Sequence, residues 1–126
     1  MDWLGWFIPR GLLRRPVTES LATPDPADLA QLDALRELGS RLELPHPVCA
    51  LLEFASESDA RSAVDALGQE GFACKVQALA GGRWGVRASS TLVPTPGTIT
   101  RLRERLKESC ETLNGTYLSW HAPPVY

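Results

Sequence analysis

The stretch that decides the fold is FACKVQALAGGRWGVRA, residues 72–88. Apolar and polar side chains alternate over residues 72–78 and again over residues 84–88, which is the period of a half-buried strand. Gly81 and Gly82 lie between the two runs and supply the backbone freedom of a tight turn. The stretch therefore predicts a β-hairpin with one exposed face. The side chains predicted on that face are Lys75, Gln77 and Arg87.

A helix is predicted on each side of this hairpin. Before it, Ser56 can cap a helix over residues 57–70, in which small apolar side chains share one face and Gly71 ends the run. After it, residues 98–113 place apolar side chains at helical spacing, and Asn114-Gly115 ends them. Both helices have an apolar face that suits packing on a sheet.

Two more strands complete the pattern. An apolar run over residues 48–54 follows the Pro45-His46-Pro47 break, and residues 116–121 follow the last helix. The predicted order from residue 48 is strand, helix, strand, strand, helix, strand. This is the βαββαβ order of ferredoxin-like α+β folds, with an antiparallel sheet and two helices on one face. On the opposite, open face we expect Cys49, Leu51 and Glu53 beside the polar residues of the hairpin.

The residues before the first strand are predicted to add a helix and an arm. Residues 25–42 favour a helix because Asp25 is a good N-cap and Pro26 suits the first helical position. Its leucines recur at helical spacing and should pack on the body as one stripe. They are Leu29, Leu32, Leu35 and Leu38. Residues 1–24 have no sustained period and are predicted as an irregular arm, which leaves residues 25–126 as the single domain.

The arm is rich in aromatic and basic residues. The aromatic ones are Trp3, Trp6 and Phe7, and the basic ones are Arg10, Arg14 and Arg15. We expect the aromatic rings to pack against the domain, because they bury large areas where a groove is available. Contact with a membrane surface and contact with a protein are the alternatives that the arginines leave open.

Composition and charge narrow the class of protein. The chain has 126 residues, of which 44% are hydrophobic, enough for one core. Thirteen basic against fifteen acidic residues give a formal charge of −2, so direct binding of nucleic acid is not expected. Cys49, Cys74 and Cys110 are odd in number and lie among apolar residues, which predicts buried reduced thiols in a cytoplasmic protein. The opening apolar run is too short for a signal peptide or a membrane span.

Motifs for metal, cofactor or catalytic chemistry are not found. The two histidines, His46 and His121, do not belong to any metal-binding spacing, so neither a metal nor a cofactor is expected. His46 precedes the strand that holds Cys49, but that thiol is better explained as part of the core. We predict that the chain is not an enzyme. A nuclease or hydrolase that uses both histidines and a carboxylate remains the alternative.

Two surface features are compatible with binding. Trp84 and Tyr117 are the strand aromatics on which RNA bases would have to stack, but the aromatic and basic signature of such sheets is missing. The helix with Arg101, Arg103 and Arg105 mixes charges of both signs, which is typical of a solvated surface. The same three arginines are also candidates for binding an acidic segment of a partner protein.

Several segments, read together, resemble a known family. They are Phe54, Ser56 and Asp59-Ala60, then Gly71-Phe72 and Val76, then Trp84 to Ala88, Leu92-Val93-Pro94, Ile99 to Leu106, and Asn114 to Trp120. In this order, from Leu29 to His121, they are similar to the regulator of ribonuclease activity B family, also called ribonuclease E inhibitors. The resemblance implies a non-catalytic ferredoxin-like domain that binds an essential endoribonuclease and lowers its activity.

The last strand departs from the family pattern. Where the family tends toward Glu-Tyr-Asp-Gly-Trp, this chain keeps only Tyr117 and Trp120, which are carried over as tentative binding residues. If the missing acids bind the ribonuclease, the partner of this chain differs; if they shape the turn, nothing is lost. A ferredoxin-like module that forms a homodimer or binds a small ligand, with no link to a ribonuclease, is the alternative function.

Overall fold

One four-stranded antiparallel sheet carries the fold, with the strands in the order β2-β3-β1-β4. The computed structural model describes residues 22–126, so the predicted aromatic contacts of Trp3, Trp6 and Phe7 lie outside the described residues. The strands are β1 (His46–Phe54), β2 (Ala73–Ala78), β3 (Trp84–Leu92) and β4 (Thr116–His121). The helices are α1 (Pro26–Glu37), α2 (Glu57–Gln69), α3 (Pro96–Thr112) and the short 3-10 helix η1 (Ala80–Gly82).

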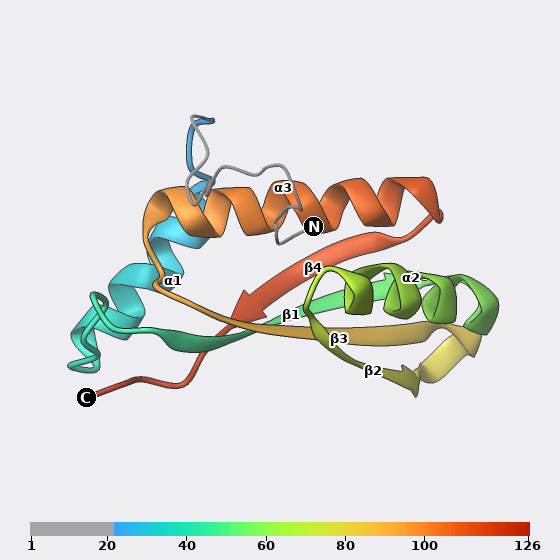
Figure 1. The fold of residues 1–126 in the computed structure, drawn as a ribbon, viewed down its shortest axis with the longest axis horizontal. Helices are drawn as coiled ribbons and strands as arrows, with labels where there is room; N and C mark the ends of the chain where they lie inside the picture. The colour runs from blue at the N-terminus through green and yellow to red at the C-terminus, as the bar shows by residue number, and fades with distance from the viewer. Residues whose placement is uncertain (1–21) are drawn as a thin grey trace.

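The two faces of the sheet are set by β1. Its even-numbered residues are buried, and its odd-numbered residues are all at least partly exposed. The buried face packs against apolar residues of α2 and α3, and Figure 1 shows α3 above the strands, α2 across β1 and β3, and α1 beside the start of α3. This is an α+β architecture in which the opposite face of the sheet is left open by the helices that the structure describes.

The open face has the predicted composition. Leu51 of β1 pairs with Arg87 of β3, and Arg87 pairs with Lys75 of β2, so these three side chains share one side of the sheet. Cys49 and Glu53 flank Leu51 at the neighbouring odd positions of β1. The shared face predicted from alternation alone is confirmed.

Two of the described α-helices, α1 and α2, end in one backbone motif, and the end of α3 has one of its two hydrogen bonds, from the N–H of Gly115 to Cys110 O. At the end of α1, the N–H of Gly39 donates to Arg36 O and the N–H of Ser40 donates to Leu35 O, both at 3.0 Å. These two bonds satisfy carbonyls that the last helical turn leaves open. The motif needs a residue with positive φ, and Gly39 (86°), Gly71 (99°) and Asn114 (56°) supply it.

This motif corrects the predicted length of the first helix. Residues 25–42 were predicted as helical, but α1 ends at Glu37 because Gly39 adopts the left-handed conformation. The leucine stripe is also wrong in part. Leu32 and Leu35 are buried, whereas Leu29 is 39% and Leu38 60% exposed, because α1 presents only one narrow side to the body.

Other bounds shift for local reasons. The predicted helix 98–113 begins earlier, at Pro96, because Thr95 caps it and exchanges hydrogen bonds with Thr98 in a capping box. The second hairpin strand runs to Leu92 instead of residue 88, since β1 begins at His46 and gives β3 a partner along its whole length.

The prediction of three buried thiols holds only for Cys110. Cys49 is partly exposed because it lies at an odd position of β1, on the open face. Cys74 is partly exposed because it lies on β2, at the edge of the sheet. Burial raises the pKa of the Cys74 and Cys110 thiols from 9.0 to about 11.

Candidate protein-interaction surface

A buried carboxylate, Asp28, joins α1, α3 and β4. Asp28 lies in the first turn of α1 and is 1% exposed. It accepts hydrogen bonds from Arg103 Nε at 2.9 Å and Nη2 at 2.7 Å, and a third from Trp120 Nε1 at 2.9 Å. A buried charge is tolerated only where it is paired and hydrogen-bonded in this way. Asp28 therefore ties the added helix to the body of the domain.

Asp25 and Tyr117 also contact this cluster, Asp25 through an ion pair with Arg103 at 3.8 Å. The Arg103 guanidinium carbon lies 4.9 Å from the centre of the Tyr117 ring, a cation–π contact. Burial raises the pKa of the Tyr117 hydroxyl above its ordinary value, although the nearby Arg103 charge opposes the shift. The hydrogen bonds to Asp28 raise the pKa of Arg103. Tyr117, Trp120 and Arg103 are thus held together as one packed unit.

Arg105 is bound to a different part of the chain. Its guanidinium pairs with Glu70 at the end of α2, with Glu108 at 3.3 Å, and with Ser109 Oγ at 3.1 Å. Burial lowers the pKa of Arg105, while the charge of Glu108 opposes that shift. These contacts tie α3 to α2.

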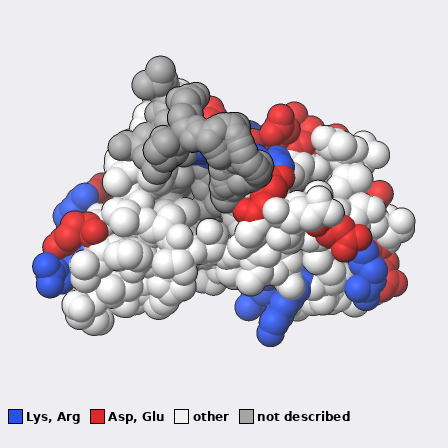
Figure 2. Space-filling view, viewed as in Figure 1, with Lys and Arg blue, Asp and Glu red and all other residues white. Residues whose placement is uncertain are grey.

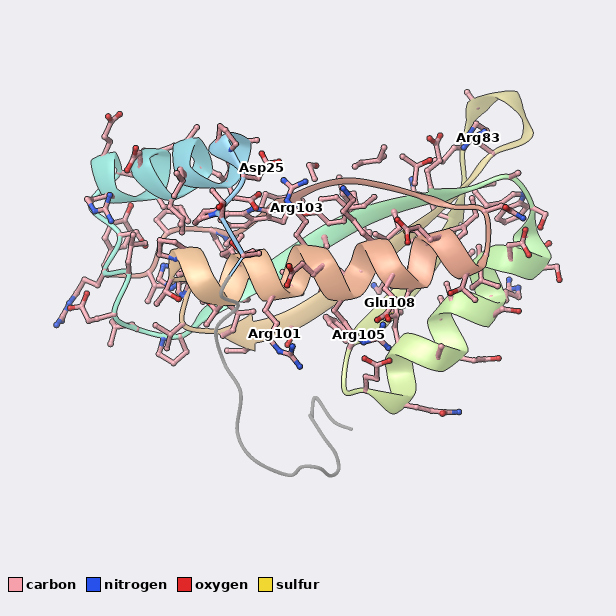
Figure 3. The ribbon with its side chains drawn as sticks, turned by 90° about the horizontal axis from the view of Figure 1, so that it is seen from above. Asp25, Arg83, Arg101, Arg103, Arg105 and Glu108 are labelled. Carbon is pink, nitrogen blue, oxygen red and sulfur yellow. The ribbon has the colours of Figure 1, made fainter. Side chains whose placement is uncertain are left out.

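The three predicted arginines do not form one cationic surface. Figure 3 shows Arg103 on the side of α3 that faces α1, and Arg101 and Arg105 on the opposite side. A shallow depression of about 510 Å³ lies along that opposite side, and three basic and three acidic residues line it. They are Arg101, Glu104, Arg105, Lys107, Glu108 and Glu111. The mixture gives this surface no consistent sign of charge.

The two histidines lie on opposite faces of the sheet. His46 is fully buried on the helix side; its Nδ1 lies 2.7 Å from Leu44 O and its Nε2 lies 2.6 Å from Ser40 Oγ. His121 is exposed and pairs with Cys49 at an open-face position. The alternative of a nuclease that uses both histidines therefore has no shared site in this fold.

The hydrogen bonds around the buried His46 also hold the C-terminal segment, through Ser40. Ser40 Oγ accepts a hydrogen bond from the N–H of Val125 at 2.8 Å, and Val125 O accepts one from the N–H of Arg41 at 2.7 Å. The Nδ1 of His46 donates to the Leu44 carbonyl, because a carbonyl only accepts, and its Nε2 forms the hydrogen bond with Ser40 Oγ. Every polar atom of the group is satisfied, which assigns it a structural role.

The RNA-stacking alternative also loses its aromatic residues. Trp84 pairs with Phe54 and Tyr117 pairs with Leu52, both at even, helix-facing positions of β1. Both rings pack against the core. The open face offers no aromatic platform from these two residues.

Comparison with known proteins identifies the family. The family profile described as regulator of ribonuclease activity B matches residues 27–121. The chain belongs to this family of ribonuclease regulators. Neither the curated proteins nor the solved structures contain a significant match. The family match confirms the resemblance that the sequence motifs indicated and supports a role in protein–protein interaction.

The positions at which this chain differs from the family pattern are those whose side chains point outward. Thr116, Leu118 and Ser119, which stand where the family tends toward acids and glycine, are all exposed. The retained Tyr117 and Trp120 point inward and pack in the Asp28 cluster. The register shift between Leu51 and Leu52 leaves Leu118 as the extra residue of a bulge. The substitutions therefore change the outer surface of β4 and leave its packing intact.

The described residues contain no helix that is long and apolar enough to cross a membrane. Nor do they bring together three histidine, cysteine or acidic side chains that could hold a metal ion. Sequence reasoning missed Asp28 and Ser40, because a lone acid on a helix and a lone serine after it look like surface residues. The Asp-Pro-x-Asp sequence at the start of α1 could have indicated Asp28, but it was interpreted only as an N-cap at Asp25.

Proposed function

We propose that this chain is a non-catalytic regulator that binds a ribonuclease E-type endoribonuclease and lowers its activity. The observation that carries the proposal is the family match, which spans α1 through β4 and so covers nearly every described element. The family's role implies a protein partner, and the cytoplasm, where such an enzyme degrades RNA, is the compartment we expect.

The fold assignment supports the same proposal. Read from the other edge, the strand order is β4-β1-β3-β2, with every neighbouring pair antiparallel and β3 between β1 and β2. We infer from this order that the chain is a ferredoxin-like domain with α1 added. Folds of this kind host many functions, so the family match and not the fold carries the functional argument.

The surface that contacts the partner is part of the proposal. Arg103, Arg105 and Trp120 are engaged in contacts within the chain, which favours a supporting role for them. Tyr117 packs beneath Arg103 in the same way. We therefore expect these four residues to shape the binding domain. Arg101 is proposed for direct contact because it lines the depression along α3.

The test is a titration against the ribonuclease E-type enzyme of the same source, with cleavage of a labelled RNA as the readout. Inhibition that saturates near one equivalent is the expected result, together with a complex that co-elutes in gel filtration. A protein that forms no complex and leaves cleavage unchanged would contradict the proposal. Cleavage of the RNA by this chain alone would contradict its non-catalytic character.

A further inference from the structure

The open face of the sheet carries two adjacent cations that the rest of the described chain does not neutralise. Lys75 and Arg87 are exposed and lie directly opposite each other on β2 and β3. Like charges in this position repel each other, which destabilises a strand pair. Figure 2 shows Lys and Arg side chains projecting from the underside of the molecule, below the strands, with uncharged atoms around them.

The surrounding residues do not supply a counter-charge. Glu53 is the acid of β1 on this face, and it pairs with Arg83 at 2.9 Å. Within residues 22–126, neither Lys75 nor Arg87 forms an ion pair. By contrast, Arg36, Arg41 and Arg61 each pair with a nearby acid. Lys107 on α3 likewise forms no ion pair within residues 22–126, but Lys75 and Arg87 lie directly opposite each other on the sheet.

The open face also has accessible apolar surface and is bounded at the hairpin end. Leu51 and Cys49 lie next to the cations and are only partly buried, so apolar surface remains accessible there. At the hairpin end, the side chain of Leu79 covers Gly85, at 3.2 Å from the point where a Cβ would lie. The accessible part of the face is therefore a bounded platform with cations along one side.

We propose that this platform binds an acidic segment of the partner protein, with carboxylates against Lys75 and Arg87. Opposite charges at an interface favour one partner over others and set the register of binding. An acidic protein segment fits better than RNA, because the platform lacks aromatic rings for stacking and the chain carries a formal charge of −2. The proposal rests on the proposed function only for the identity of the partner.

A peptide titration tests the platform by itself. The full-length ¹⁵N-labelled chain is titrated by NMR with a decapeptide of alternating Glu and Ser, with its Lys-Ser counterpart, and with a uridine decanucleotide. We expect the acidic peptide alone to shift the amide signals of β2 and β3, and the shifts to weaken with added salt. Shifts confined to α3, equal shifts with the RNA, or no shifts at millimolar peptide would overturn the proposal.

Matched variants separate the effect of Lys75 and Arg87 on peptide binding from the effect of net charge. Lys75→Gln with Arg87→Gln should weaken peptide binding at least about 5-fold, from the loss of two exposed charge pairs. The control, Lys107→Gln with Arg61→Gln, removes one lysine and one arginine from exposed helix positions and should bind as the wild type does. Equal weakening in both variants would show a non-specific charge effect and refute the platform.

The same variants distinguish this inference from the proposed function. If the wild type binds the ribonuclease and the Lys75/Arg87 variant binds equally well, the platform proposal fails and the function stands. If the wild type does not bind the ribonuclease but the acidic peptide still shifts β2 and β3, the function fails and the platform stands. A dimer of the chain by light scattering that the Lys75/Arg87 variant abolishes would instead assign the face to self-association.

Discussion

The carboxylate of Asp28 and the guanidinium of Arg103 form a bidentate pair between residues that are 75 positions apart in sequence. The Arg103 guanidinium lies over the ring of Tyr117, and the indole of Trp120 donates to Asp28, so the pair connects an added helix to the last strand. Because Asp28 is 1% exposed, its charge depends on these neighbours.

Replacement of this carboxylate should be costly. Asp28→Asn keeps the shape of the side chain but removes the charge that Arg103 binds. We expect the free energy of unfolding to fall by about 3 kcal/mol, the low end for a broken buried pair, because Arg103 is partly exposed. Urea denaturation followed by circular dichroism measures the change. Arg61→Gln, which removes an exposed pair on α2, should cost less than about 0.5 kcal/mol.

Substitution of two glycines by alanine should change the free energy of unfolding in opposite directions. A Cβ at Gly115 would lie 2.3 Å from Cε1 of Phe54, a ring that is fully buried. Gly115→Ala should therefore lower the free energy of unfolding by about 1–3 kcal/mol, the usual cost of overpacking. Gly68→Ala, on α2 with no atom within 4 Å of the new methyl, should raise it by up to about 1 kcal/mol. Equal effects of the two variants in thermal melts would contradict this account.

The repulsion between Lys75 and Arg87 should lower the stability of the domain, while the same two charges favour binding of the acidic peptide. Lys75→Glu replaces repulsion of Arg87 by attraction, so the free energy of unfolding should rise by about 0.2–1 kcal/mol. Lys75→Gln should give an intermediate value, and high salt should reduce the differences. Both variants should bind the acidic peptide more weakly than the wild type. A Lys75→Glu protein that is less stable than the wild type at low salt would argue against repulsion at this pair.

Thiol alkylation should report the burial of Cys74 and Cys110. With a pKa near 11 instead of 9.0, Cys74 and Cys110 hold about 100-fold less thiolate at pH 8 than an unshifted thiol. Iodoacetamide should alkylate both at least that much more slowly in the native protein than in urea, as peptide mapping by mass spectrometry can measure. Since the folded pKa is the raised one, the stability from these neutral thiols is present below pH 9.0 and is lost as the pH rises toward about 11. Equal native and denatured rates for Cys110 would refute its burial.

Local patterns in the sequence predicted most of the fold. The alternation around Lys75 and Arg87, the Ser56 cap and the Asn114-Gly115 stop depend on neighbours in the chain, and the structure has each of them. The end of α1 was missed because the leucine spacing continues past Gly39, whereas the backbone does not. Spacing shows where a helix can form, but a left-handed residue decides where it ends.

The candidate site was less accessible from sequence, for a physical reason. Arg103 and Arg105 were chosen as surface charges, but their partners Asp28 and Glu70 come from other helices. A charge pair between distant segments leaves no periodic trace in either of them. Tyr117 and Trp120 were carried over from the family pattern, and only the register of β4 shows that they point inward.

The bond from Trp120 to Asp28 spans 92 positions, nearly the whole described chain. During synthesis, Asp28 leaves the ribosome 92 residues before the indole that completes its hydrogen bonds. A nascent chain that lacks β4 would have to bury this carboxylate without one of its three donors, so α1 gains little by docking at that stage. Docking of α1 is therefore expected to wait for β4, and α1 should be the last helix to become protected from hydrogen exchange.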